Sequence, residues 1–112
     1  LEVLERLRAL AKWEPRGSRP RDAGAIARGR GVTYSKYESV RTYVAVVADV
    51  TVDRTTGHIK VDRVFVAHDC GQIINPDGLR NQIEGNVVQT VSRSVVEKLT
   101  FSRACLLFTL RR

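Results

Sequence analysis

The stretch that decides the fold, Val40–Ala67, reads VRTYVAVVADVTVDRTTGHIKVDRVFVA. Its first half, up to Asp53, is rich in β-branched and aromatic residues, which suit a pleated and half-buried surface. Its second half, from His58, alternates apolar with charged residues, a pattern that is typical of a strand. Gly57 stands in the turn between the halves, where it can adopt a positive φ without strain. The sequence therefore predicts a β-hairpin.

Beyond the hairpin, the sequence predicts a long helix from about Asp77 to about Lys98. Asn75 or Asp77 can cap its first turn, and Pro76 suits a position near the start of a helix. One apolar stripe recurs every four residues, and we expect it to pack on the sheet: Leu79, Ile83, Val87, Val91 and Val95, widened by Val88, Val96 and Leu99. Gly85 lies inside this helix, where a glycine indicates close approach of another backbone or of a ligand.

On the other side of the hairpin, Leu1–Trp13 has the apolar spacing of an amphipathic helix, and Glu14-Pro15 would end it. Arg16–Gly31 is rich in Gly, Pro, Ser and Arg and is predicted to be a flexible basic loop. Its Gly29–Gly31 stretch lacks both the preceding strand and the following Lys-Ser/Thr of a phosphate-binding loop, so that function is not favoured.

These elements predict an α+β fold: an N-terminal helix, a β-hairpin, a long helix packed on the sheet, and an optional short C-terminal strand. We divide the chain into an N-terminal helix with its basic loop (1–31), the hairpin and long helix (32–101), and a tail of different composition (102–112). With 112 residues, the chain is long enough for one small domain.

The net charge of +7 raises nucleic acid as a possible partner class. The stretch 42–98, however, holds six Lys and Arg against seven Asp and Glu, so the basic excess lies in the flanks. Because a nucleic-acid domain carries its basic stripe on the folded face, nucleic acid is not favoured. No run approaches eighteen apolar residues, so no membrane span is predicted. With two cysteines and no disulfide framework, the cytoplasm is the default compartment.

His68 and Cys70 point the same way along the predicted strand and invite two chemical interpretations. A closed zinc site needs four ligands with paired short spacings, and this chain offers one His-x-Cys pair. A Cys–His nucleophile pair would need an orienting group and an oxyanion donor, and neither can be named. A strand end turning into a loop explains both residues better, so we predict no metal ligands and no catalytic residues.

Asn81 and Gln82 stand in the first turns of the predicted helix, shortly after a glycine-containing turn. The start of a helix presents free N–H groups and a positive end. An amide side chain both donates and accepts hydrogen bonds, so it can recognise the edge of a heterocycle. The alternative, that both amides simply solvate an exposed first turn, stays open on the residues alone.

The order of these motifs resembles a known family. A strand ending Ala-His-Asp-Cys-Gly (67–71) leads to Asn-Pro-Asp-Gly-Leu-Arg-Asn-Gln-Ile-Glu-Gly (75–85), followed by Val-Val-Gln-Thr-Val-Ser-Arg (87–93). This series is similar to the molybdenum-cofactor-binding subunit of the xanthine oxidase and aldehyde oxidoreductase family, closest to the isoquinoline 1-oxidoreductase β-subunit type of bacteria. The resemblance covers Gly29 to about Phe101, with weaker support from the N-terminal helix.

The resemblance implies a function for the turn. In this family the strand-to-helix turn lies against the pterin of molybdopterin, which implies cofactor contacts for Gly71, Asn81 and above all Gln82. Glu84 would have a supporting role, since it lies on a different side of the helix. Such enzymes hydroxylate N-heterocycles or oxidise aldehydes, water supplies the oxygen, and an iron–sulfur subunit or domain takes the electrons.

The chain also departs from the family. The catalytic glutamate of the family's Gly-x-Gly-Glu motif is not present in it, and neither are other segments that surround the cofactor. The tail after Phe101 differs from the family, as a truncation or a shifted reading frame would make it. We therefore expect a fragment that is inactive alone, holds no cofactor and self-associates into a homo-oligomer. The alternative is a small basic, non-catalytic binding module.

Overall fold

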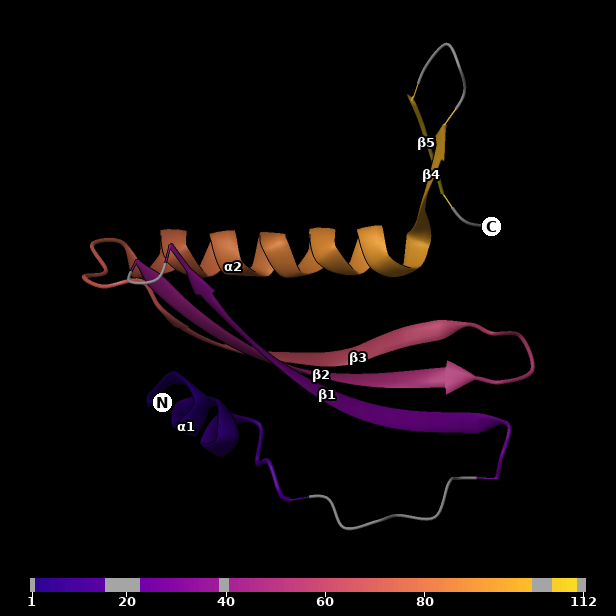
Figure 1. Cartoon of the computed structure of the whole chain (residues 1–112), viewed down its shortest axis with the longest axis horizontal. Coiled ribbons are helices and arrows are strands. Elements are labelled where there is room, and N and C mark those ends of the chain that lie inside the picture. Colours follow the sequence, from indigo (N-terminus) through magenta and orange to yellow (C-terminus); the bar gives the residue numbers. More distant parts are fainter. Residues whose placement is uncertain (1, 16–22, 39–40, 102–105, 111–112) are drawn as a thin grey trace. The chain divides into compact units, whose positions relative to one another are not determined.

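The computed structural model describes the backbone of residues 2–15, 23–38, 41–101 and 106–110, and the side chains of these residues up to Thr100. It divides into two compact units, Leu1–Gln72 and Ile73–Arg112. The first unit holds a helix and a three-stranded antiparallel sheet, and the second holds a helix and a two-stranded sheet (Figure 1). The predicted α+β class is confirmed. The division at residues 31 and 101 stays a prediction.

The predicted hairpin is present in the first unit. Strand β2 (Thr42–Asp53) pairs antiparallel with β3 (Ile59–Asp69). In the turn, Gly57 has a φ of +74°, and its N–H donates to the carbonyl oxygen of Asp53 over 2.7 Å. The carboxylate of Asp53 accepts from the backbone N–H of Thr55 at 2.8 Å, which holds the pKa of Asp53 below its ordinary value. Asp62 marks a bulge in β3, because Asp49 pairs with Arg63 while Val50 pairs with Val61.

A third strand, β1 (Ile26–Tyr37), corrects the predicted loop at 16–31, of which residues 26–31 are extended. It pairs with β2 along its whole length, and the two glycines that suggested a loop lie within this ladder. A Cβ at Gly29 would stand only 3.5 Å from Cγ2 of Val50. Pairing with β2 therefore overrides the low strand propensity of glycine at these positions.

Helix α1 (Glu2–Leu10) forms the core of the first unit by packing on one face of β2 and β3 (Figure 1). The buried side chains are Leu7 of α1, Ala11 in the turn that follows α1, and Ala45 and Val47, two residues apart in β2. Lys12 ends the helix with a φ of +47°. The predicted amphipathic helix is confirmed from Glu2 onward, and it stops before Trp13.

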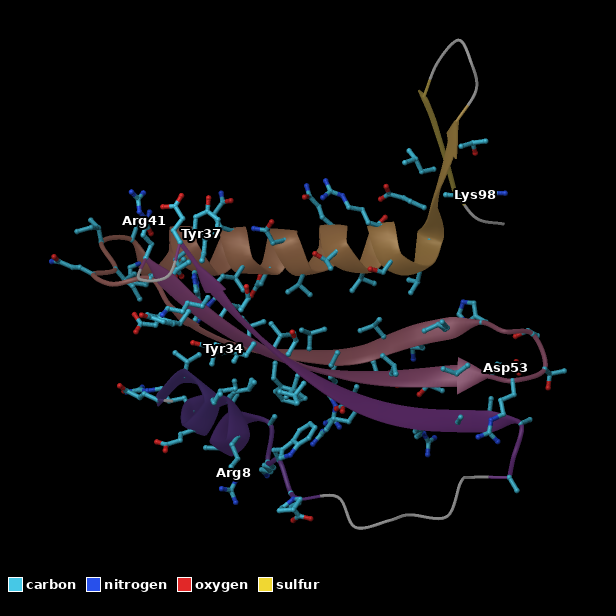
Figure 2. All side chains as sticks on the ribbon, viewed as in Figure 1. Arg8, Tyr34, Tyr37, Arg41, Asp53 and Lys98 are labelled. Atoms are coloured by element: carbon cyan, nitrogen blue, oxygen red, sulfur yellow. The ribbon has the colours of Figure 1, made fainter. Side chains whose placement is uncertain are left out.

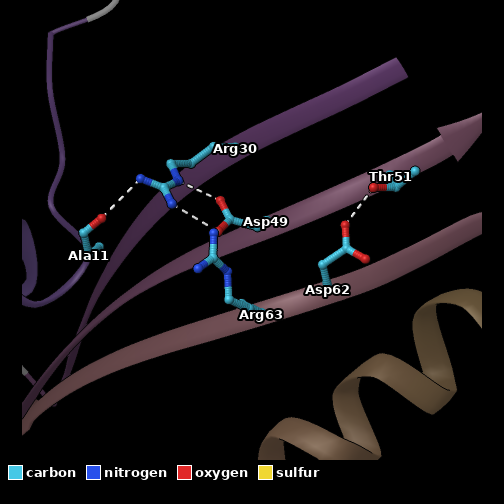
Figure 3. Close-up of polar contacts among 6 residues, drawn as sticks. All are labelled: Ala11, Arg30, Asp49, Thr51, Asp62 and Arg63. Atoms are coloured by element: carbon cyan, nitrogen blue, oxygen red, sulfur yellow. Dashed lines mark hydrogen bonds and ion pairs between the residues drawn. The ribbon is translucent and has the colours of Figure 1, made fainter. Parts of the chain in front are cut away.

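An ion-pair row crosses the same sheet face beyond the end of α1 (Figure 3). Arg30 of β1 lies opposite Asp49 of β2, which lies opposite Arg63 of β3. Arg30 donates to the carboxylate of Asp49, and it also donates to the carbonyl oxygen of Ala11 over 2.9 Å. Arg63 forms an ion pair with the same carboxylate. The hydrogen bonds from Arg30 hold the pKa of Asp49 below its ordinary value, and Asp49 raises the pKa of Arg30. The row thus ties three strands to the helix.

Helix α2 (Pro76–Val91) opens the second unit at the predicted place. The Oδ1 atom of Asn75 accepts a hydrogen bond of 2.9 Å from the backbone N–H of Gly78, so Asn75 is the N-cap. Pro76 occupies the start of the helix, where its missing N–H costs nothing. Of the two residues that could cap this helix, the structure uses Asn75.

The end of α2 differs from the predicted helix end at Lys98. The helix stops at Val91, a π-helical turn spans Ser92–Val96, and strand β4 (Glu97–Phe101) follows and pairs with β5 (Leu106–Leu110). The hydroxyl of Ser94 donates to the carbonyl oxygen of Thr90 over 2.7 Å. Such side-chain bonds compete with the helical ladder and open a wider turn. A short C-terminal strand was predicted, and the structure has two.

The apolar stripe of α2 is half-buried, and no residue of the helix is fully buried. Packing of this stripe on the β1–β3 sheet joins the two units and stays a prediction. None of the helices in the described part of the chain is long and apolar enough to cross a membrane.

Candidate functional site

The strand-to-helix turn begins where β3 ends at Asp69. The turn that follows needs a residue in the left-handed backbone conformation, and Gly71 adopts it with a φ of +81°. Its N–H donates to Oδ1 of Asp69 over 3.1 Å, so the carboxylate holds the chain reversal in place. The backbone at this glycine is therefore exposed and held in one conformation, which suits contact with a ligand through main-chain atoms.

A hydrogen-bonded cluster supports the turn from the neighbouring strand. The hydroxyl of Thr42 donates to the carbonyl oxygen of Asp69 over 2.8 Å and lies 2.7 Å from Nε2 of His68. Nδ1 of His68 is buried and has no hydrogen-bond partner among the described residues. A polar group from outside this chain would satisfy it.

Local geometry at the start of α2 also constrains the sequence. A Cβ added at Gly78 would meet the side chain of Asn75 at 3.0 Å, tighter than nine in ten real Cβ contacts. Glycine at this position therefore allows the cap to form. The cap leaves the following turns of the helix in a fixed orientation relative to the turn at Asn75.

The two predicted ligand amides follow in α2. The side chains of Asn81 and Gln82 are exposed, and neither makes a hydrogen bond within the part of the chain that the structure describes. The carbonyl oxygen of Gln82 accepts from the side chain of Asn86 over 2.8 Å. Gly71 belongs to the first unit, whereas Asn81 and Gln82 belong to the second.

Two neighbours of these amides are exposed as well. The supporting role of Glu84 stays a prediction. For Gly85 we expected close approach of another backbone or of a ligand. Among the described residues, nothing lies within 4 Å of the position that a Cβ would take there. The expectation for Gly85 therefore stays a prediction.

The geometry of the described residues does not support a metal site or a Cys–His nucleophile pair. The His, Cys, Asp and Glu side chains of the described residues form no group of three or more that could hold a metal ion. Cys70 is a half-buried free thiol, and Cys105 lies outside the described residues. His68 instead belongs to the hydrogen-bonded cluster with Thr42.

Sequence reasoning missed that cluster because it treated His68 only as a metal or nucleophile candidate. The signal was available in part, since antiparallel pairing of the hairpin places Val44 opposite His68 and Tyr43 opposite Asp69, which brings the start of β2 to the turn. The hydroxyl of Thr42, one residue earlier, can then reach the end of β3.

The sequence of this chain is similar to a known domain family and to several known proteins. The molybdopterin cofactor-binding domain family matches residues 7–109 of the chain. One of the subunits of nicotinate dehydrogenase from Pseudomonas putida is 40% identical over 102 residues, covering 84% of this chain and 9% of that protein. Nicotine 6-hydroxylase large subunit of Paenarthrobacter nicotinovorans is 42% identical over 55 residues, 49% of this chain and 7% of that protein.

The β subunit of isoquinoline 1-oxidoreductase from Brevundimonas diminuta is 28% identical over 104 residues, covering 93% of this chain and 12% of that protein. No solved structure gives a significant match. The chain thus spans about a tenth of the length of the relatives it matches. The family match covers nearly the whole sequence, including the strand-to-helix turn. The chain belongs to the molybdopterin cofactor-binding domain family.

Proposed function

We propose that this chain is a segment of a molybdenum hydroxylase that acts on N-heterocycles or aldehydes, and that its strand-to-helix turn contacts the pterin of the cofactor. The observation that carries the proposal is the capped turn, which leaves the amides of Asn81 and Gln82 exposed and without partners among the described residues. The names of the matched relatives, among them nicotinate dehydrogenase and isoquinoline 1-oxidoreductase, support an N-heterocyclic substrate.

The residues present fit a pterin by the chemistry of their donors and acceptors. A pterin ring edge alternates hydrogen-bond donors with acceptors, and a carboxamide offers both. Gln82 would hold such an edge, Asn81 would add a second amide, and Gly71 would let the ring approach the backbone. When bound, the cofactor supplies the two-electron oxidation, and these residues bind and orient it.

The test replaces Gln82 within the complete molybdenum subunit, purified together with its iron–sulfur partner. Gln82→Ala should lower the amount of molybdenum and pterin bound to the purified enzyme, because a hydrogen bond to the ring is lost. Gln89→Ala is the matched control, since Gln89 is an exposed residue of the same type on the same helix. Equal cofactor content in both variants and in the unaltered protein would contradict the role of Gln82.

By itself the 112-residue chain should bind no cofactor and oxidise neither aldehydes nor N-heterocycles with an artificial electron acceptor. Positioning and charge stabilisation supply most of an enzyme's rate, and this chain holds neither the family's catalytic glutamate nor the iron–sulfur partner. Molybdenum-dependent turnover above a buffer blank would refute this proposal.

We further propose that the isolated chain self-associates. Exposed apolar side chains in the second unit include Ile73, Ile74 and Val88, and Ile74 is 84% exposed. Strands β1 and β3 are the two edge strands of the three-stranded sheet in the first unit, which offers a second route through strand addition. Sedimentation equilibrium from low micromolar concentration upward tests the proposal, and a single species at 12.6 kDa throughout would exclude it.

A further inference from the structure

The first unit has a groove that is separate from the strand-to-helix turn. It has a volume of 770 Å³ and lies beyond the end of α1, against the ends of β1, β2 and β3 that carry the ion-pair row. We call it the basic groove. Its volume falls in the range of small-molecule sites. Five cationic side chains line it, from the end of α1 and from two strands: Lys12, Arg28, Arg30, Lys60 and Arg63.

The carboxylates of the basic groove do not balance these cations. They are Glu14, Asp49 and Asp62, so two positive charges remain. Asp49 is shared between Arg30 and Arg63 and can neutralise only one of them. Asp62 accepts from the hydroxyl of Thr51 over 2.5 Å and lies 3.4 Å from Nζ of Lys60. The excess therefore falls on the arginines and on Lys12.

The two arginines of the ion-pair row differ in exposure, and only Arg63 is exposed enough to contact a ligand. The side chain of Arg30 is 26% exposed and that of Asp49 14%, so this pair is largely enclosed between the strands and α1. The side chain of Arg63 is 67% exposed, and it reaches Asp49 through Nη2 alone, at 3.2 Å. Figure 3 shows Arg30 between Ala11 and the carboxylate of Asp49, whereas Arg63 reaches that carboxylate from strand β3. One edge of its guanidinium group is thus available to an anion.

We propose that the basic groove binds a small anionic ligand that bears a phosphate or diphosphate group, with Arg63 and Arg28 as its main contacts. A guanidinium fork matches the oxygens of a phosphate in pairs, and a doubly charged group would offset the excess of two cations. Trp13, a half-buried residue, also lines the groove and offers a ring surface for the organic part of the ligand.

Calorimetric titration of the full 112-residue chain with inorganic diphosphate at constant ionic strength tests the proposal. Trp13 is the only tryptophan of the chain, so its fluorescence should change with the same saturation curve. Arg63→Gln and Arg28→Gln should each weaken binding about fivefold, the upper range for an exposed charge pair. Asp62→Asn should strengthen binding about threefold by the same reasoning, and an unfolded variant could not produce that gain.

Arg8→Gln is the matched control, because it removes the same charge from an exposed residue of the same unit outside the groove. Figure 2 shows Arg8 on the side of α1 that faces away from the sheet. We expect its affinity to stay within about twofold of the unaltered chain. An equal loss in Arg8→Gln and Arg63→Gln would overturn the proposal, as would the absence of saturable binding at millimolar diphosphate. Binding of an oligonucleotide without binding of diphosphate would also overturn it.

Discussion

The two units of the chain differ in where their apolar side chains lie. In the first unit, α1 covers one face of the sheet, and four side chains are fully buried between them. In the second unit, α2 carries the Gln82 motif, yet it has no buried residue, and Val88 is 68% exposed. The region with a core of its own is therefore not the region that carries the family's signature. Within its own unit, the helix that carries the signature thus depends on its backbone ladder and its cap.

The length and composition of α2 give the helix little stability of its own. The helix has 16 residues, close to the length at which isolated helices are marginal in water. Gly85 costs about 1 kcal/mol relative to alanine in a helix interior. The valines of α2 restrict their own rotamers in a helix as well. The Asn75 cap recovers about 1 kcal/mol, which offsets Gly85 alone.

The largest expected contrast between the units is in backbone hydrogen exchange. In the isolated chain, amides of β2 should exchange at least about a hundredfold more slowly than amides of α2, which corresponds to ~3 kcal/mol of opening free energy. β2 is paired on both sides and covered by α1, whereas α2 has no fully buried residue within its own unit. Exchange measured residue by residue by NMR is the test. Equal protection in both elements would mean that α2 has a core partner in the isolated chain.

The next contrast lies within α1. Leu7→Ala should destabilise the chain by about 2–5 kcal/mol, because Leu7 is 1% exposed and its removal leaves a cavity against β2. Leu10→Ala is the matched control on the same helix. Leu10 is 56% exposed, so its loss should stay within about 0.5 kcal/mol. Denaturant unfolding followed by circular dichroism measures both. Comparable losses in the two variants would show that α1 does not pack as described.

Much of this fold could be predicted from local patterns. The hairpin follows from β-branched residues around a Gly57 turn, and Asn75-Pro76 marks the start of α2. What failed depends on long-range pairing. Strand β1 was hidden because Gly29 and Gly31 signal a loop locally, while the pairing of Arg30 with Asp49 is visible only once β2 lies beside it. The early end of α2 comes with a bond from the side chain of Ser94 to a backbone carbonyl, which competes with the helix.

The candidate site was predicted unevenly for a similar reason. Gly71, Asn81 and Gln82 belong to a contiguous motif, so the family resemblance identified them. Their roles remain proposals. The cluster of Thr42 with His68 joins positions 26 residues apart, and no local pattern indicates it. The basic groove was missed as well, because its cations come from separate strands that the sequence does not mark as neighbours.

A smaller effect is expected from the ion-pair row. Asp49→Asn should cost about 1–2 kcal/mol, because Arg30 and Arg63 would lose a shared charged acceptor on a half-buried sheet face. Asp77→Asn is the control in the second unit, where the carboxylate is exposed in the first turn of α2. It should cost less than about 0.5 kcal/mol. Chemical unfolding at neutral pH distinguishes them. If Asp77→Asn lowered the stability and Asp49→Asn did not, the ion-pair row would not stabilise the first unit as predicted.

The smallest expected effect is the acid dependence of stability, which should also belong to the first unit. The pKa values of Asp49, Asp53 and Asp62 lie below their ordinary value, because Arg30, the backbone N–H of Thr55 and the hydroxyl of Thr51 bond to the respective carboxylates. The unfolded chain therefore binds more protons than the folded chain as pH falls below about 4, the ordinary aspartate value. The stability contributed by these groups is fully present above that pH and is lost as pH falls through the lowered values.

Thermal unfolding between pH 7 and pH 2, followed by circular dichroism, checks this dependence. The midpoint should change little down to about pH 5 and then decrease, and Asp49→Asn should make the decrease shallower because one of the three carboxylates no longer titrates. A midpoint that falls between pH 7 and pH 5 would assign the dependence to histidine and not to these carboxylates. An unchanged acid limb in Asp49→Asn would mean that the shared carboxylate contributes no pH-dependent stability, and that Asp53 and Asp62 carry the effect.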